Sequence, residues 1–505
     1  MRDGVLLDGR SLTPEGLARA ARGGVTFNIS DEGRARMVAA RAVIERAVAD
    51  RVPVYGVTTG LGARVTEALD HDALTAFSYQ TIRGRAHAVG KPALTEIVRA
   101  AMIARANTLV TGAAGASPAV CDHYLACLNA GLTPVVGELG SIGAADLVWN
   151  ATAALALIGE GPMENASGQI GPGAEVMQAA EIVPPSLGPR DGLAMCNSSS
   201  YSAALSGLAC AAAMDAYSAA QSAAALSMEG FVANLSPLDP RVLGLREQAG
   251  QAEAAAELMH LLDGSALKQT GAARRLQDPI SIRNVVQVHG AVCAALSVLN
   301  DAAMSELNGA SDNPAVLLED AKILSIGNYF TPHLCIALET ASRSFVHLAM
   351  AQLARLAKLQ SPRFSDLPLF LAAPGSTSNG FAPVMKTAEA VVSKLVHAAQ
   401  PVAVWPSINA DGAEDALTNT PTAAQALIEV AECSATLTAI ELLVAARAVE
   451  LRGGAGRLGA PMQKVLHVVR ERSPALTEDR PLGGEITTVA EAIRDGVFSV
   501  GSDHP

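Results

Sequence analysis

Apolar positions in this chain follow helical spacing over long stretches, above all after residue 200. They recur every three or four residues, the period expected of α-helices that pack on one another. The main predicted helices are 201–229, 285–308, 333–360, 383–400 and 421–452. The last one begins with Thr420-Pro421 and is followed by Gly453-Gly454, which are typical capping residues. Because 1.5 Å per residue makes it roughly 48 Å long, we expect a bundle of long helices.

The first 200 residues alternate shorter segments with turn residues. Leu94 to Val110 has an amphipathic helix pattern, and Val52 to Gly62 predicts a short strand that enters a glycine-bearing loop. We therefore expect a mainly α fold. A smaller N-terminal α/β part would cover residues 1–200, and a long-helix bundle would cover residues 201–505.

Composition narrows the function classes. Apolar residues make up 50 % of the chain and aromatic residues only 3 %, which favours helices packed closely through small side chains. The net charge of −12, without a basic cluster, argues against a nucleic-acid partner or an anionic membrane. Seven scattered cysteines, the absence of an apolar signal core and the absence of a long uncharged apolar stretch predict a reduced, cytoplasmic protein.

Known cofactor motifs are missing from the sequence. The ten histidines show no metal-ligand spacing such as HExxH, and neither a GxGxxG loop nor a phosphate-binding Walker loop is present. We therefore expect no metal and no nucleotide cofactor.

Polar residues gather instead in seven short segments rich in glycine, asparagine and aspartate. These segments, in chain order, are Tyr55–Gly62, Gly140–Leu147, Gly192–Asn197, Gln277–Arg283, Asn308 with Ser311–Pro314, Gly327–Phe330 and Ala413–Asp415. Taken together they resemble the signatures of the histidine/phenylalanine/tyrosine ammonia-lyase family. The resemblance keeps the family's order from about residue 50 to residue 415, so it covers most of the chain.

The resemblance implies a role for each matching position. Tyr55 would be the catalytic base, Arg283 would bind the substrate carboxylate, and Asn197 would face the reacting group. Loops from neighbouring subunits of a homotetramer would complete the site around a small substrate derived from an amino acid. The other expected substrate-binding residues are His87, Gln277, Asn313, Tyr329, Phe330, Lys386 and Glu414.

The residue types fit these roles, although each also has a structural alternative. A tyrosine base needs neighbours that stabilise its phenolate, and otherwise Tyr55 is a buried tyrosine with a satisfied hydroxyl. Arg283 offers a planar fork that matches a carboxylate, and otherwise it forms a salt bridge. The alternatives for the rest are loop and cap roles for Asn197, Gln277, Asn313 and Glu414, core packing for Tyr329 and Phe330, and a solvated helix position for Lys386.

The glycine-rich segment departs from the family in the residues that matter most. The family loop reads Gly-Ser-Val-Gly-Ala-Ser-Gly-Asp-Leu, and its Ala-Ser-Gly cyclises and dehydrates into an electrophilic methylidene-imidazolone group. Here Ala144 and Ala145 lead directly into Asp146, so one residue is missing and no serine or cysteine remains to dehydrate. Other departures are Ile280 in place of a second tyrosine, Tyr329-Phe330 in place of Phe-His, and Met385 in place of a glutamine.

The missing electrophile has a chemical consequence. The family needs it because a primary amine leaves poorly, whereas a quaternary nitrogen leaves as a neutral tertiary amine without such help. The ergothionase branch of the family lacks the prosthetic group and eliminates trimethylamine from ergothioneine, and this sequence resembles it in what is lost. Three hypotheses remain open: an elimination of this kind, a lyase or aminomutase that makes an electrophile from another triplet such as Gly140-Ser141-Ile142, and a catalytically inactive scaffold.

Overall fold

The computed structural model describes residues 4–59, 71–373, 375–402 and 408–498, with the backbone alone at 71–75. Helices make up 59 % and strands 7 %, which confirms the expected mainly α fold. The chain divides into two compact units that are both discontinuous in sequence. Unit 1 comprises residues 1–211, 300–338 and 401–425, and unit 2 comprises residues 212–299, 339–400 and 426–505. The expected division at residue 200 stays a prediction.

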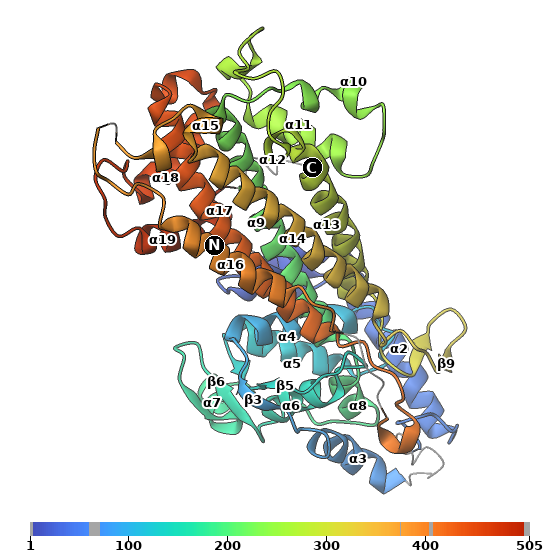
Figure 1. The fold of residues 1–505 in the computed structure, drawn as a ribbon. Helices are drawn as coiled ribbons and strands as arrows, with labels where there is room; N and C mark the ends of the chain where they lie inside the picture. Colours follow the sequence, from blue (N-terminus) through green and yellow to red (C-terminus); the bar gives the residue numbers. More distant parts are fainter. Residues whose placement is uncertain (1–3, 60–70, 374, 403–407, 499–505) are drawn as a thin grey trace. The chain divides into compact units, whose positions relative to one another are not determined.

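Unit 1 combines helices with four small sheets (Figure 1). The sheets pair β1 with β2 in parallel, and β3 with β5, β8 with β9, and β4-β6-β7 in antiparallel order. The strands are β1 Gly4–Leu7, β2 Thr26–Ile29, β3 Val89–Pro92, β4 Thr133–Pro134, β5 Gly137–Leu139, β6 Pro162–Glu164, β7 Ile170–Pro172, β8 Ala315–Leu317 and β9 Lys322–Leu324. The helices are α1 Pro14–Ala21, α2 Asp31–Ala49, α3 His71–Arg83, α4 Thr95–Leu109, α5 Pro118–Asn129, α6 Leu147–Leu157, α7 Gly173–Ala179 and α8 Asp191–Cys196.

Long helices dominate the rest of the chain. The division between the units falls inside α9 Ser200–Phe231, α13 Val285–Asn308, α14 Pro332–Leu359 and α17 Thr420–Leu451. The helices that lie wholly in unit 2 are α10 Pro240–Leu243, α11 Gln251–Leu261, α12 Ile280–Arg283, α15 Pro362–Ser365, α16 Val384–Ala398, α18 Ala460–Arg472 and α19 Gly483–Arg494. Short 3₁₀ turns occupy Ser236–Leu238, Ala266–Lys268, Leu369–Leu371, Ala410–Gly412 and Gly454–Arg457. All five long predicted helices are confirmed to within two residues at each end.

Two expectations for the first 110 residues need correction. Helix α4 exists where it was predicted, but it is not amphipathic, because every residue from 98 to 109 is buried. The strand expected at the start of 52–62 is wrong: the backbone N–H groups of Val57, Thr58 and Thr59 all donate to the Val54 carbonyl, which makes a tight turn. Residues 60–62, the glycine-bearing end of that segment, lie outside the described residues.

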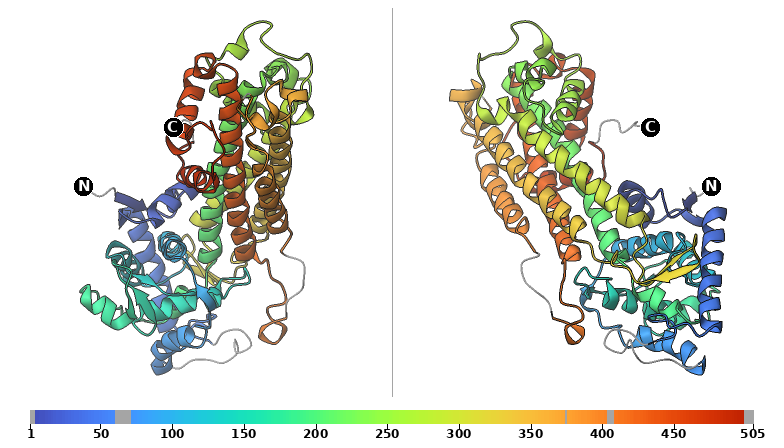
Figure 2. Two further views of the ribbon diagram at one scale, coloured as in Figure 1. Left: turned by 60° about the vertical axis from the view of Figure 1, so that its left-hand side comes forward. Right: turned by 90° about the vertical axis from the view of Figure 1, so that its right-hand side faces the viewer.

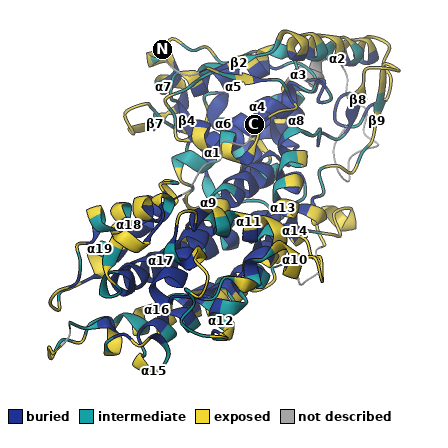
Figure 3. Cartoon of the chain, turned by 90° about the horizontal axis from the view of Figure 1, so that it is seen from above, coloured by how far each residue is buried: buried dark blue, intermediate teal, exposed yellow. Residues whose placement is uncertain are grey.

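In unit 2 the long helices lie side by side (Figure 2), and α9 and α17 are buried along most of their length (Figure 3). The missing side chain of Gly230 allows this close approach, because a Cβ added at this position of α9 would meet the Cβ of Ala448 on α17 at 2.7 Å. A buried ion pair joins α14 to α17, with Arg355 Nε 2.6 Å from Glu441 Oε1 and Arg355 Nη2 3.0 Å from Glu441 Oε2. The Ser227 hydroxyl of α9 donates to the same carboxylate at 2.8 Å, so one charge pair connects three helices.

Helix α13 is long and strongly apolar. By length and composition alone it could cross a membrane, and among the described residues it alone passes that test. Half of its most apolar window is buried inside the structure. The core helix of a globular protein passes the same test, so this is weak evidence for a membrane span.

Loss of the buried ion pair should destabilise unit 2. Both side chains are fully buried, and removing one partner leaves an uncompensated charge that costs about 3–5 kcal/mol. We expect Glu441→Ala to lower the midpoint of thermal unfolding clearly. The control is Glu429→Ala on the same helix, which removes an exposed pair with Lys394 and should leave the midpoint almost unchanged. Equal shifts for the two variants in circular dichroism melts would contradict this assignment.

Candidate functional site

The turn that carries Tyr55 is fixed by apolar packing in unit 1. Val54 and Val57, on either side of the tyrosine, belong to a buried cluster with Ile44 of α2 and Val316 of β8. The Thr58 hydroxyl closes the turn, since it accepts from the Val54 N–H at 2.7 Å and donates to a backbone carbonyl. Tyr55 itself is half-buried. The turn that carries Tyr55 therefore packs on β8, the strand that follows the Asn313-Pro314 segment.

The glycine-rich loop between β5 and α6 is closed by one buried carboxylate, that of Asp146. This carboxylate accepts from the Ser202 N–H at 2.7 Å, from the Ser202 hydroxyl at 2.7 Å and from the Ser141 hydroxyl. Burial raises the pKa of Asp146, and the hydrogen bonds oppose that effect. Ala145 and Asp146 both adopt left-handed backbone, with φ of 62° and 44°, which disfavours residues other than glycine. The carboxylate thus holds a strained turn in place.

The same loop is hydrogen-bonded to three other stretches of unit 1, one inside a segment picked out from the sequence and two shortly after such a segment. Its Ala145 N–H donates to the Tyr329 carbonyl at 3.1 Å, and the Ala145 carbonyl accepts from the Ser198 N–H at 3.1 Å. The Ile142 carbonyl accepts from the Asn419 N–H at 2.9 Å. The loop is therefore the point at which the segments around Asn197, Tyr329-Phe330 and Glu414 converge in unit 1.

The residues of this loop do not fit the prosthetic group that its pattern implies. Ala144, Ala145 and Asp146 offer no hydroxyl or thiol that could be lost by dehydration. The loop's own serine, Ser141, lies elsewhere in the turn, where its hydroxyl donates to Asp146 and accepts from the Gly143 N–H at 3.0 Å. The serine therefore has a structural role here, and no electrophile is derived from this loop.

Asn197 and Asn313, two of the expected substrate-binding residues, lie in contact. The Asn197 side-chain amide, which is buried, donates to the Asn313 carbonyl at 2.7 Å. The Asn313 side-chain oxygen accepts from the Ile326 N–H at 3.0 Å and from the Ser325 hydroxyl at 3.2 Å. Both amides therefore hold backbone in this structure.

A buried charge cluster next to Asn313 was not predicted from the sequence. Arg105 of α4 grips Asp312 with two contacts of 2.6 and 3.0 Å, and Arg190 donates to the Pro314 carbonyl at 2.7 Å. Burial lowers the pKa of Arg190 to about 10. The available signal was an arginine between apolar residues in the segment Met102–Ala106, because a charged side chain in such surroundings needs a partner.

The remaining unit 1 residues lie nearer the surface. Tyr329 and Phe330 are half-buried, and Phe330 pairs through its backbone with Ala144 of the glycine-rich loop. Glu414 is exposed at the end of a tight hairpin in which its backbone N–H and carbonyl both bond to Asn409. His87 is exposed, and its ring Nε2 lies 3.2 Å from the Gly84 carbonyl.

Unit 2 carries the other three predicted residues. The Arg283 guanidinium donates to the Gln277 side-chain oxygen at 2.7 Å, so these two positions do come together. Ile280, which replaces the family's tyrosine, is 67 % exposed one helical turn away. Lys386 is exposed on the first turn of α16. The side chains of Gln277, Arg283 and Lys386 all reach the surface of the single chain.

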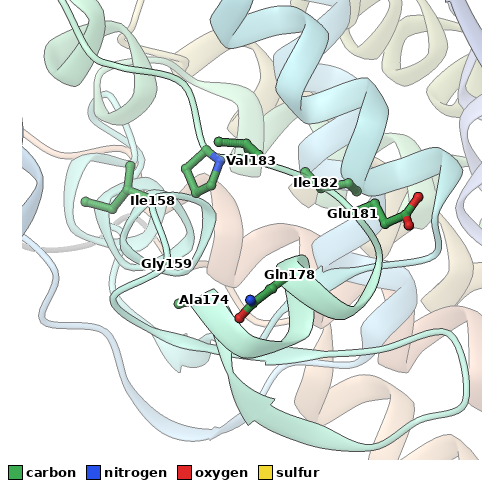
Figure 4. A pocket seen from close by; sticks show the side chains of 8 residues that line it. Ile158, Gly159, Ala174, Gln178, Glu181, Ile182 and Val183 are labelled. Carbon is green, nitrogen blue, oxygen red and sulfur yellow. The ribbon is translucent and has the colours of Figure 1, made fainter.

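Two surface cavities stand apart from the predicted residues. The first, of about 480 Å³, is lined by the mostly apolar side chains shown in Figure 4, where Gln178 points inward and Glu181 points outward. The second, of about 430 Å³, lies between the starts of α16 and α19 and includes Asp479 and Arg480. No predicted site residue lines either cavity, so neither is taken as the reactive site.

Comparisons with known proteins give the family. The model of the aromatic amino acid lyase family matches residues 12–471. Histidine ammonia-lyase of Anaeromyxobacter dehalogenans is 34 % identical and covers 98 % of this chain and 99 % of its own length. The structure of the ergothioneine-degrading enzyme ergothionase from Treponema denticola, in complex with desmethyl-ergothioneine sulfonic acid, matches with a TM-score of 0.91 at 27 % identity. It covers 99 % of this chain and 100 % of that one.

Histidine ammonia-lyase from Trypanosoma cruzi matches with a TM-score of 0.90 at 31 % identity, over 98 % of this chain and 94 % of its own. The family model and these relatives cover nearly the whole chain, including every segment that converges on the glycine-rich loop. The chain therefore belongs to the aromatic amino acid lyase family, and it is a carbon–nitrogen lyase.

Proposed function

We propose that this lyase eliminates a tertiary amine, first of all trimethylamine, from a betaine-type aromatic amino acid such as ergothioneine. The observation that carries the proposal is the Ala144-Ala145-Asp146 sequence, which cannot supply the family's electrophile. Without an electrophile the leaving group must be activated in advance, and a quaternary nitrogen is so activated. The similarity to ergothionase, at 27 % identity over the full chain, supports this reading.

The proposed reaction is a 1,2-elimination. Tyr55, as phenolate, takes the proton from the β-carbon. The electron pair of that C–H bond forms the double bond between the α- and β-carbons, and the C–N bond breaks with its electrons going to nitrogen. Trimethylamine leaves neutral, so no acid is needed at nitrogen. A thioimidazole ring on the β-carbon would spread the charge that develops there, which makes the β-proton more acidic.

Arg283 is proposed to bind the substrate carboxylate, since a guanidinium can form two parallel hydrogen bonds to it. Gln277 would hold that guanidinium in position, as its 2.7 Å contact suggests. The quaternary nitrogen would lie against aromatic faces and carboxylates, for which Tyr329, Phe330 and Glu414 are candidates. We assign Lys386 and His87 to the rim of the site as substrate-binding residues.

We further propose a cytoplasmic homotetramer in which loops of neighbouring subunits complete the site. Exposed apolar side chains beside Arg283 support this, since Ile280 and Leu276 are 67 % and 92 % exposed in the single chain. A monodisperse monomer in light scattering would contradict the assembly.

The substrate test compares ergothioneine, histidine betaine (hercynine) and histidine. We expect trimethylamine to be released from one or both betaines, and no ammonia from histidine, because a primary amine is a poor leaving group without the electrophile. Mass spectrometry of the volatile amine and of the unsaturated acid gives the answer. Release of ammonia from histidine at a comparable rate would favour a conventional histidine ammonia-lyase, the activity for which the relative at 34 % identity is named. No turnover of any of them would favour an inactive scaffold.

The base is tested by Tyr55→Phe, which keeps the ring and removes the oxygen that accepts the proton. Loss of a general base typically lowers kcat by 10²-fold or more, and we expect a fall of at least roughly that size. The matched control is Tyr79→Phe, a half-buried tyrosine of α3 whose hydroxyl accepts from the Leu187 N–H. It should retain kcat to within about twofold. If Tyr55→Phe behaves like this control, another residue is the base.

A further inference from the structure

Glu306, near the end of α13, is a half-buried carboxyl group that the proposed reaction does not use. Its Oε2 accepts a hydrogen bond of 3.0 Å from the Ser199 hydroxyl. Ser199 stands two residues after Asn197, and its backbone N–H donates to the Ser311 hydroxyl at 3.0 Å. Glu306 therefore lies directly behind the segment that the family resemblance places against the substrate.

A second carboxylate holds the other end of the same segment. Ser202 is bound through both its N–H and its hydroxyl to Asp146 of the glycine-rich loop. Ser198, between the two attachments, donates its N–H to the Ala145 carbonyl. The run 198–202 is thus bonded at Ser202 to Asp146, which belongs to the glycine-rich loop, and at Ser199 to Glu306.

These two carboxyl groups influence one another. Burial raises the pKa of Glu306, the Ser199 hydrogen bond opposes that rise and the negative charge of Asp146 adds to it, which together place the pKa at about 7. Tyr201, within this run, is neutral because burial raises the pKa of its hydroxyl. On the side of Ser311 the charge of Asp312 is compensated by Arg105. Asp146, held by hydroxyl and backbone N–H donors, is the charged group that acts on the pKa of Glu306.

We propose that Glu306 is a specificity-determining residue, which favours a substrate with a permanently cationic α-nitrogen and gives up its proton to solvent when that cation binds. The inference rests on the proposed function, which places the departing nitrogen against Tyr329 and Phe330, two residues whose backbone pairs with the glycine-rich loop. A cation beside the loop stabilises the carboxylate form of Glu306. At neutral pH, where part of the population carries a proton on this group, binding then releases that proton to the buffer.

Calorimetry measures this linkage directly. Histidine betaine is titrated into the full-length Tyr55→Phe protein, which should bind it without rapid turnover, in buffers of different ionisation enthalpy at pH 7. We expect release of a fraction of a proton per site, falling towards zero near pH 9, where Glu306 is already ionised. The matched ligand 3-(imidazol-4-yl)propionate has the same ring and carboxylate but no cationic nitrogen, and it should release none.

Substitution assigns the proton to one residue. Adding Glu306→Gln should abolish the release and weaken betaine binding roughly tenfold at pH 8, about the effect of one nearby charge, while binding of the propionate is not weakened. Asp301→Asn, which changes an exposed carboxylate on the same helix, should change neither. If the Gln variant does not fold, Ser199→Ala offers a second route: loss of its hydrogen bond raises the pKa of Glu306, so proton release at pH 8 should increase.

The outcomes separate this inference from the proposed function. Betaine binding without proton release, or equal weakening of both ligands by Glu306→Gln, overturns the role of Glu306 even if the wild-type enzyme liberates trimethylamine. Proton-linked betaine binding that disappears in the Gln variant supports the role even if no trimethylamine forms, in which case only the proposed reaction fails. Absence of betaine binding to every form overturns both.

Discussion

A single buried carboxylate, that of Asp146, determines the form of the region around which the candidate site is arranged. It binds Ser141 within its own loop and Ser202 on the first turn of α9. Asp146 and the preceding Ala145 adopt left-handed backbone, which residues other than glycine usually avoid. With the turn so fixed, the loop's backbone groups reach Tyr329, Ser198 and Asn419. Three segments far apart in sequence therefore share one anchor.

This anchor also limits the chemistry. The residues Ala144-Ala145-Asp146 provide a carboxylate but no hydroxyl that could be lost by dehydration. The Ser141 hydroxyl, elsewhere in the loop, donates a hydrogen bond to that carboxylate. What the region offers instead is negative charge, from Asp146 and, near neutral pH, from Glu306. An electrophile would activate a poor leaving group, whereas negative charge favours a substrate whose nitrogen is already cationic. A loop without the electrophile, in a region that carries negative charge, is the physical basis of the proposed function.

Much of the fold could be predicted from the sequence, because long helices repeat one local pattern. The ends of α9, α13 and α17 follow from apolar spacing and capping residues. The segment 52–59 could not be predicted in this way, since its β-branched residues favour a strand, while burial of Val54 and Val57 against α2 selects a turn. Asn197 and Asn313 were found through motifs. The partnership of Ser199 with Glu306 joins residues 107 apart in the chain, and no local pattern encodes such a pair.

The central claim is that this family member works without the electrophile that its loop position implies, and the mass of the loop tests it most directly. Proteolysis followed by mass spectrometry should give a peptide spanning residues 140–147 at the mass calculated from its sequence. A peptide lighter by about two waters, the loss expected for cyclisation and dehydration, would show that the loop is processed after all. It would contradict the account whatever substrate the enzyme then proved to use.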